Sequence, residues 1–296
     1  MSFQNIHLEQ IQFLESILFE AVGEELRVNG YELLSGGDIN TALRVHSTKG
    51  QFFVKWNEQA DADLFVCEAK GLQLLQSTGN IRIPEVLSFG QKVQKAYLLL
   101  EYVPSARPRK DYWQQLGQQL SLVHGHTQAF FGLEYDNYIG FLRQSNEPSD
   151  NGIDFFIEKR LKVQAGLAYY NGLLPKKQYD QFFNFYEKLP SLLPNEKPSL
   201  LHGDLWSGNV LVDDQGAPCL IDPAVYYGLR EAELAFTRLF GGFGEGFYDS
   251  YQEATPLSAG FSERAEIYNL YPLLVHLNLF GGGYLPGIER VLKKYA

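Results

Sequence analysis

A polar segment separates two apolar runs in residues 200–212, whose sequence is LLHGDLWSGNVLV. A simple turn needs one glycine and an asparagine, whereas this stretch also holds His202, Asp204 and Trp206. An aspartate can accept the proton of a hydroxyl group, and an asparagine such as Asn209 can offer its side-chain oxygen to a divalent cation. The residue types therefore indicate a catalytic loop that acts on a hydroxyl group beside a metal ion.

The spacing of these residues matches the catalytic loop of protein kinases, which reads H-R-D-L-x-x-x-N. His202, Asp204 and Asn209 fall on its positions, and Gly203 stands where the kinases have arginine. That chemistry needs a second, ionised metal ligand after a later strand, and Asp222 follows the apolar run CLI thirteen residues after Asn209. We predict Asp204 as the catalytic residue, Asn209 and Asp222 as Mg²⁺ ligands, and His202 as a supporting, hydrogen-bonded residue.

Residues nearer the N-terminus could bind the phosphates of ATP. Lys55 ends the run FFVK and Glu68 lies in VCEA, which matches a strand lysine and the helix glutamate that orients it. Gly36 and Gly37 lie in LSGGDINTA, where a phosphate-covering loop is expected. A surface lysine, a solvated helix face and a hairpin turn would explain each feature singly. Their order along the chain favours a nucleotide site.

Hydrophobic periodicity predicts the elements that position these residues. Spacings of three and four predict helices over residues 3–22 and 62–79, and β-prone runs predict five strands, at residues 31–37, 42–48, 50–56, 84–90 and 95–103. Further helical patterns follow at residues 111–127, 154–172, 176–189, 229–240 and 262–280. We predict an α+β, protein-kinase-like bilobal fold. A small five-stranded antiparallel N-lobe would span residues 1–103, and a larger, mainly helical C-lobe residues 104–296.

The connector between the predicted lobes is marked by Pro104 and Pro108. In this fold class the strand that leads into the connector borders the nucleotide. We therefore expect main-chain groups of Glu101, Tyr102 and Val103 to bind adenine.

Composition excludes several classes of partner. The chain has 25 Lys and Arg against 35 Asp and Glu, a net charge of −10, which disfavours binding to nucleic acid or an anionic membrane. Cys67 and Cys219 lie in apolar surroundings and are expected to be reduced, buried thiols. The N-terminus lacks a signal-peptide pattern, and the apolar stretch LYPLLVHLNLF is too short to span a bilayer. We expect a cytoplasmic, soluble monomer.

Departures from the protein-kinase pattern point to a small acceptor. Asp222 is not followed by Phe-Gly, an A-P-E motif is missing downstream, and little chain remains for an activation loop. A peptide substrate would therefore lack its platform. The acceptor could be an aminoglycoside, choline or a sugar, and a non-catalytic nucleotide-binding module is the remaining alternative.

Several longer stretches resemble the fructosamine kinase (ketosamine 3-kinase) family. They are SGGDIN, DNYIG, LLHGDLWSGN, IDPAVYYGLREAELAF, LFGGF and LYPLLVHLNLFGGGY, spread over nearly the whole chain. Trp206, Pro223 and Ala224 are more specific than general small-molecule kinase patterns. The resemblance implies ATP- and Mg²⁺-dependent phosphorylation of the 3-hydroxyl of ribulosamine, erythrulosamine or fructosamine, free or protein-bound, with deglycation as the result. Some eukaryotic relatives have a cysteine in the glycine-rich loop, where this chain has Asp38.

The acceptor side of the site is less clearly marked in the sequence. Trp206, Asp136 and Asn137 are candidates for the wall against which the acceptor binds, although the segment DNYIG could equally be a helix-linking turn. Glu233 lies in a segment similar to the acidic helix start that braces the catalytic loop of small-molecule kinases. We expect it to support that loop.

Overall fold

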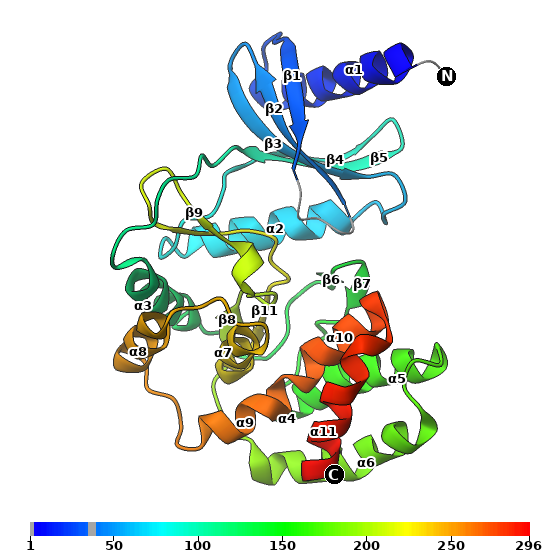
Figure 1. Ribbon diagram of the computed structural model, residues 1–296, viewed down its shortest axis with the longest axis vertical. Coiled ribbons are helices and arrows are strands. Elements are labelled where there is room, and N and C mark those ends of the chain that lie inside the picture. The colour runs from blue at the N-terminus through cyan, green and yellow to red at the C-terminus, as the bar shows by residue number, and fades with distance from the viewer. Residues whose placement is uncertain (1–2, 35–39) are drawn as a thin grey trace. The chain divides into compact units, whose positions relative to one another are not determined.

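The computed structural model describes residues 3–34 and 40–296, with side chains from residue 8 onward. The chain divides into two compact units. The first contains Met1–Arg109 and Leu211–Asp222, and the second contains Lys110–Val210 and Pro223–Ala296. Figure 1 shows the course of the chain through the elements of each unit.

The first unit is built on a five-stranded antiparallel sheet, as predicted. Its strands are β1 (Val28–Leu33), β2 (Thr41–Ser47), β3 (Gly50–Asn57), β4 (Val86–Lys92) and β5 (Lys95–Glu101). They pair in the order β1-β2-β3-β5-β4. Two helices accompany the sheet, α1 (Phe3–Val22) and α2 (Leu64–Ser77), and both were expected from the periodicity.

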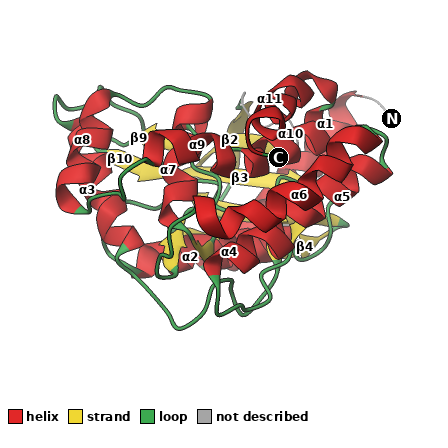
Figure 2. Ribbon diagram, turned by 90° about the horizontal axis from the view of Figure 1, so that it is seen from below, coloured by secondary structure: helices red, strands yellow, loops and turns green. Residues whose placement is uncertain are grey.

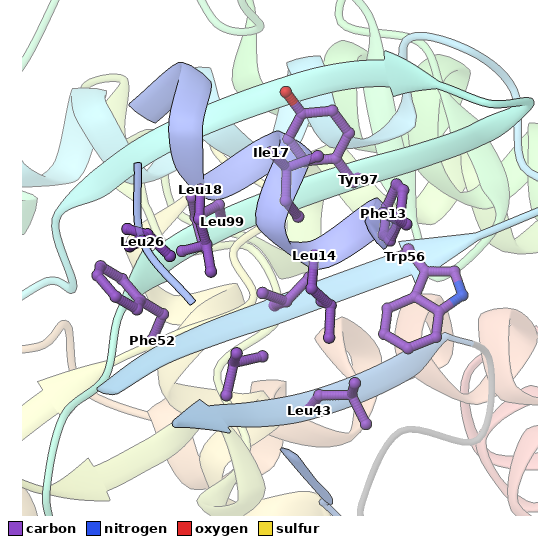
Figure 3. Close-up of a cluster of buried hydrophobic side chains, with 12 residues drawn as sticks. Phe13, Leu14, Ile17, Leu18, Leu26, Leu43, Phe52, Trp56, Tyr97 and Leu99 are labelled. Atoms are coloured by element: carbon purple, nitrogen blue, oxygen red, sulfur yellow. The ribbon is translucent and has the colours of Figure 1, made fainter. Parts of the chain in front are cut away.

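A hydrophobic core between α1 and one face of the sheet determines where Lys55 points. Phe13, Leu14, Ile17 and Leu18 of α1 pack against alternate residues of β2, β3 and β5, as Figure 3 shows. Successive side chains of a strand point to opposite faces. Because residues 52, 54 and 56 of β3 join this core, Lys55 projects from the other face of the sheet.

A short hairpin explains why residues 211–222 belong to the first unit. It consists of β9 (Val210–Val212) and β10 (Pro218–Leu220). The hairpin is tied to the first unit because its Gly216 carbonyl accepts a hydrogen bond from the Arg109 N–H at 3.0 Å, and the Leu220 N–H donates to the Arg82 carbonyl at 3.0 Å. The expected C-lobe, residues 104–296, therefore differs from the second unit, because hairpin contacts distant in sequence decide the grouping.

The second unit is mainly helical, as Figure 2 shows by its colouring. Its longer helices are α3 (Tyr112–His124), α5 (Lys162–Tyr170), α6 (Lys176–Leu192), α7 (Arg230–Leu239), α8 (Glu245–Ala254), α9 (Phe261–Tyr268), α10 (Leu270–Phe280) and α11 (Leu285–Tyr295). Two short antiparallel pairs accompany them, β6 (Asn137–Ile139) with β7 (Leu142–Gln144), and β8 (Ser199–Leu201) with β11 (Tyr226–Gly228). Within the described ranges, no helix is both long and apolar enough to cross a membrane.

The helix predicted over residues 154–172 is interrupted by a wider turn. It comprises α4 (Gly152–Phe155), a π-helical segment (Phe156–Leu161) and α5. The π segment carries Arg160, which is fully buried. Its guanidinium donates to the Ser145 carbonyl at 2.6 Å and to Asn146 Oδ1 at 2.7 Å, and it lies 4.0 Å from the centre of the Tyr226 ring. The wide turn thus accompanies a buried cation, a feature that hydrophobic periodicity does not report.

Four charged side chains, Glu196 with Arg230 and Glu231 of α7 and Arg264 of α9, pair in a mostly solvent-shielded cluster. Arg230 Nε lies 3.1 Å from Glu196 Oε1, and Arg264 bonds to both oxygens of Glu231 at 2.9 and 2.6 Å. Burial, with a further contribution from the Glu231 charge, raises the pKa of Glu196 to about 7. The Glu196 side chain is only 8% exposed, so solvent screens this effect little.

The raised pKa of Glu196 predicts a pH-dependent stability. The folded state holds this proton more tightly than the unfolded state, so the contribution to stability is full below the unfolded pKa of about 4.5 and is lost as pH rises through about 7. Glu196→Gln should remove a dependence of up to about 3 kcal/mol in the free energy of unfolding. Urea unfolding at several pH values measures it. Glu187→Gln, an exposed glutamate on α6, is the control, and equal slopes in Glu196→Gln and the parent chain would contradict the assignment.

Candidate active site

Three charged side chains of the first unit meet beneath the sheet. Lys55 Nζ lies 3.1 Å from Glu68 Oε1 on α2 and 3.0 Å from Asp222 Oδ1, just beyond β10. Lys55 is only 7% exposed. The structure therefore brings together three residues that the sequence analysis selected separately.

The charges of this group are unequal. Burial alone would lower the pKa of Lys55, but Asp222 and Glu68 outweigh it and raise the pKa above its usual value, so the ammonium stays charged. Burial raises the pKa of Glu68, and the neighbouring Asp222 charge adds to this effect. Two carboxylates thus share one ammonium, which leaves the cluster with excess negative charge when both are ionised.

Asp222 has an unusual backbone conformation. Its φ of +54° lies in the left-handed region, which few residues other than glycine adopt, although aspartate tolerates it better than most. Such strain is commonly retained at functional sites. The Asp222 side chain is 38% exposed, in contrast to the 13% and 9% of its partners Glu68 and Lys55. It is the carboxylate of this cluster that a ligand can reach.

The catalytic loop of the second unit follows β8. Gly203 has a φ of +84°, and a Cβ atom at this position would lie 2.0 Å from the Ala224 carbonyl oxygen. The Ala224 N–H donates to the His202 carbonyl at 2.9 Å, so the two segments are in direct contact. The positive φ and the close Ala224 carbonyl both require glycine at position 203. This explains why the arginine of the protein-kinase pattern is absent here.

Asn209 connects directly to Asp204. Its Nδ2 donates to the Asp204 carbonyl at 2.9 Å and to Asp204 Oδ2 at 3.1 Å. Both partners are acceptors, so the nitrogen of the amide must face Asp204 and its oxygen must lie on the other side. This orientation turns Oδ1 of Asn209 away from Asp204.

Asn209 in the second unit and Asp222 in the first each carry a side-chain oxygen of the kind that Mg²⁺ binds. Among the residues that the structure describes, no group of three or more His, Cys, Asp or Glu side chains could form a metal cage. Mg²⁺ commonly binds one or two protein oxygen ligands and completes its coordination with phosphates and water. The two residues belong to different units, Asn209 to the second and Asp222 to the first.

A cavity of about 30 Å³ in the second unit borders Asp204. Its wall includes Gly203, Tyr226, Tyr271 and His276. His276 Nδ1 lies 2.8 Å from the Pro272 carbonyl, which can only accept, so Nδ1 carries the proton. Burial lowers the pKa of His276, so the neutral ring presents Nε2 as an acceptor. The volume suits about two water-sized groups, which is enough for a hydroxyl-bearing end of a ligand but not for a whole sugar.

A family model for fructosamine kinase matches residues 11–296 of the chain. The chain belongs to the fructosamine kinase family. A protein of Synechocystis named a probable ketoamine kinase is 37% identical over 96% of each chain. The chloroplastic protein-ribulosamine 3-kinase of Arabidopsis thaliana is 35% identical over 92% of this chain and 84% of its own. Members of this family are phosphotransferases, as the catalytic-loop spacing predicted.

Solved structures agree with this assignment. A crystal structure from Thermobifida fusca, assigned as a fructosamine-3-kinase, is 31% identical over 95% of this chain and 97% of its own, with a TM-score of 0.85. An aminoglycoside phosphotransferase in a ternary complex with AMP-PNP and hygromycin B has a TM-score of 0.65 over 96% of this chain and 98% of its own, at 18% identity. The second likeness shows the fold alone, and the predicted kinase-like α+β fold is confirmed.

The predicted acceptor residues of this fructosamine kinase family member lie in different environments. Trp206 is 39% exposed, and its ring lies over Gly208, where a Cβ atom would meet it at 2.2 Å. Asp136 accepts a hydrogen bond from the Asn146 N–H at 3.0 Å. Asn137 is 3% exposed and donates to the Val225 carbonyl at 2.8 Å. Trp206 remains a candidate for acceptor contact, whereas Asn137 is placed to hold the segment after Asp222.

The remaining predicted residues fall into two groups. Gly36 and Gly37 lie outside the described residues. The Glu101 side chain bonds to Arg82 at 3.2 Å, and its N–H donates to the Glu85 carbonyl, so Glu101 is already engaged within the first unit. Tyr102 and Val103 directly follow β5, and the Arg44 guanidinium lies 4.5 Å from the centre of the Tyr102 ring.

Glu233 supports the catalytic loop through its backbone. Glu233 Oε1 accepts from the Gly203 N–H at 2.7 Å, and Oε2 accepts from the His202 N–H at 3.1 Å. Burial would raise the pKa of this carboxyl, but hydrogen bonds, chiefly from His124, hold the pKa below its usual value. His202 is itself fully buried, and its Nδ1 accepts from the Asp204 N–H at 3.3 Å.

Sequence reasoning missed two residues of this region, His276 and His124. His276 is the single polar ring in the apolar run LYPLLVHLNLF, a signal that could have been noticed. His124 lies at the end of a helical pattern, and its importance depends on partners more than 100 positions away.

Proposed function

We propose that this chain transfers the γ-phosphoryl group of ATP to the 3-hydroxyl of ketosamines. The acceptors would be ribulosamine, erythrulosamine or fructosamine, free or attached to a protein. The observation that carries the proposal is Asp204, which borders a cavity and is bonded by Asn209, in a chain of the fructosamine kinase family. The protein-ribulosamine 3-kinase name of a relative at 35% identity supports this acceptor class.

The residues of the first unit would bind the nucleotide. Lys55 would contact its phosphates, and Glu68 would keep that ammonium in place through the bonds at 3.1 and 3.2 Å. Gly36 and Gly37 would cover the phosphates. The main chain at Glu101, Tyr102 and Val103 would bind adenine. The Glu101 N–H already donates to the Glu85 carbonyl, so this N–H would take no part.

Asp204 would orient the acceptor hydroxyl and accept its proton. Asn209 holds the carboxylate of Asp204, and the neutral Nε2 of His276 could accept a hydrogen bond from a second hydroxyl in the same cavity. Asn209 and Asp222 would bind Mg²⁺, which when present neutralises charge on the phosphates. Positioning of the hydroxyl and electrostatic stabilisation would supply most of the rate, as expected for a loose transition state.

Phosphate at C3 gives the product a specific fate. Loss of a proton from C1 enolises the C2 ketone, and the electron pair of the enol then expels inorganic phosphate from C3. Water adds to the resulting C1 imine and releases the amine together with a 3-deoxy dicarbonyl sugar. The 3-phosphorylated ketosamine and one water thus give inorganic phosphate, the free amine and the dicarbonyl sugar. Deglycation therefore follows without a second enzyme.

Incubation of a lysine ribulosamine with Mg·ATP tests this function. We expect a new phosphorus NMR signal that decays to inorganic phosphate while free lysine appears over hours. A phosphate on a hydroxyl distal to the ketone would instead persist, because the enol cannot expel it. A persistent ribulosamine phosphate, or turnover of an aminoglycoside or choline with no reaction of ribulosamine, would contradict the proposal and leave a different small-molecule kinase. Absence of ATP turnover with every acceptor would indicate a nucleotide-binding module.

A further inference from the structure

A buried chain of hydrogen bonds runs from α8 and α3 to the catalytic loop. His124, the last residue of α3, lies between two partners, with Nδ1 2.8 Å from the Tyr251 hydroxyl of α8 and Nε2 2.9 Å from Glu233 Oε2 of α7. His124, Glu233 and Tyr251 are 3%, 3% and 1% exposed. Glu233 in turn accepts the N–H groups of the two residues before Asp204.

The residues at the two ends of this hydrogen-bond series determine which atoms donate and which accept. Arg230 Nη1 lies 3.3 Å from the Tyr251 hydroxyl and can only donate, so the tyrosine oxygen is the acceptor of that bond. The Tyr251 O–H is then available to donate to His124 Nδ1. The ionised Glu233 at the other end can only accept, so His124 Nε2 must carry a proton. Donors can thus point in one direction from Arg230 to Glu233, with the His124 proton on Nε2.

Close helix packing holds the members of this chain at fixed separations. Gly117 lies on α3 where a Cβ atom would come within 2.2 Å of the Phe247 carbonyl oxygen of α8. The two helix backbones are therefore in contact, and they run side by side in Figures 1 and 2. The His124 and Tyr251 rings pack edge to face, with 5.5 Å between their centres. A displacement of the His124 or Tyr251 ring would therefore also displace Glu233 and the catalytic loop.

We propose that His124 is a positioning residue for Asp204. Its Nε2–H, fixed by the Tyr251 hydroxyl, holds the Glu233 carboxylate in the orientation that receives the His202 and Gly203 N–H groups. The backbone immediately before Asp204 is thereby fixed. The inference rests on Asp204 being the residue that meets the acceptor hydroxyl in the proposed reaction.

Two substitutions at position 124 separate the N–H group from simple burial. The amide nitrogen of glutamine can occupy the place of Nε2, so His124→Gln should keep most of the activity. His124→Leu fills the space without a donor and should lower kcat by up to about 10²-fold, the effect of a displacement of about 1 Å at a catalytic group. The KM for ATP should stay within about twofold in both, because the nucleotide-binding residues belong to the first unit. Equal losses in the two variants, or no loss in His124→Leu, would overturn the proposal.

A second pair of variants tests the hydroxyl of α8. Tyr251→Phe removes the donor to His124 Nδ1 and should lower kcat, whereas Tyr248→Phe removes a hydroxyl of the same helix that contacts Thr237 at 3.2 Å and should not. Equal losses of kcat would show a general effect of α8 and overturn the role of Tyr251.

Nitrogen NMR of histidine-labelled protein reads the tautomer without any turnover. The intact chain should show His124 as the neutral Nε2–H form, and Tyr251→Phe should reduce the fraction of that form. A His124 signal typical of the Nδ1–H tautomer or of the imidazolium would overturn the proposed direction of the hydrogen bonds from Tyr251 through His124 to Glu233. Because this readout needs no acceptor, it distinguishes failure of the positioning role from failure of the proposed ketosamine reaction.

Discussion

Asp204→Asn is expected to lower kcat by about 10²–10⁴, the usual range for loss of a general base. An amide is a very weak base and carries no charge, so the acceptor hydroxyl loses its proton acceptor. The geometry should persist, because the oxygen of the new amide can still accept the hydrogen bond that Asn209 Nδ2 now makes to Asp204 Oδ2 at 3.1 Å. The affinity for Mg·ATP should change little.

Steady-state kinetics with a ribulosamine acceptor and isothermal titration of Mg·ATP measure the two parts of this prediction. Asp180→Asn serves as the matched control, since Asp180 lies on α6, is 53% exposed and pairs with Lys176. Its kcat should equal that of the parent chain. Near-parental turnover by folded Asp204→Asn would remove Asp204 from its catalytic role.

Spacing over a few residues of sequence predicts several contacts of the candidate site. The catalytic loop is a short segment in which Asp204 and Asn209 contact each other directly, so their separation of five residues is enough to predict their relation. Strand alternation does the same for Lys55, because the core-facing residues on either side of it turn its side chain to the other face. Physical constraints that act over a few residues can thus be read from the sequence alone.

Contacts between distant segments could not be predicted in this way. Residues 211–222 group with the first unit because hairpin carbonyls and N–H groups pair with Arg82 and Arg109, far away in the chain. The π-helical turn depends on hydrogen bonds from Arg160 to the loop before α4. His124 and Glu233 meet across 109 positions. Each of these features is decided by packing, which periodicity in one segment does not contain.

Glu233 of the second unit and Glu68 of the first differ in how their charges are stabilised. In the second unit, Glu233 is buried but has hydrogen-bond donors on both oxygens, which keep it ionised. In the first unit, Glu68 and Asp222 compete for Lys55, and the pKa of Glu68 is raised. A fully satisfied carboxylate suits a structural role, whereas an incompletely neutralised pair suits a site that receives a cation.

Asp222→Ala is therefore expected to lower kcat/KM for Mg·ATP by about 10³-fold or more, because several kcal/mol of charge stabilisation by the metal would be lost. Asn209, the other predicted ligand, is neutral and provides a single amide oxygen. Alanine at a φ of +54° also strains the backbone. Asp222→Asn is the better comparison, since asparagine tolerates this conformation and removes only the charge.

Titration of Mg²⁺ at a fixed ATP concentration separates the metal from the nucleotide. In Asp222→Asn the Mg²⁺ concentration for half-maximal activity should rise steeply, while metal-free ATP should bind as well as before, because Lys55 keeps its bonds to Glu68 at 3.1 and 3.2 Å. Removal of the Asp222 charge should also lower the pKa of Glu68, which that charge helps to raise. Unchanged Mg²⁺ dependence in both variants would place the metal elsewhere, and loss of metal-free ATP binding would show that Asp222 acts mainly by holding Lys55.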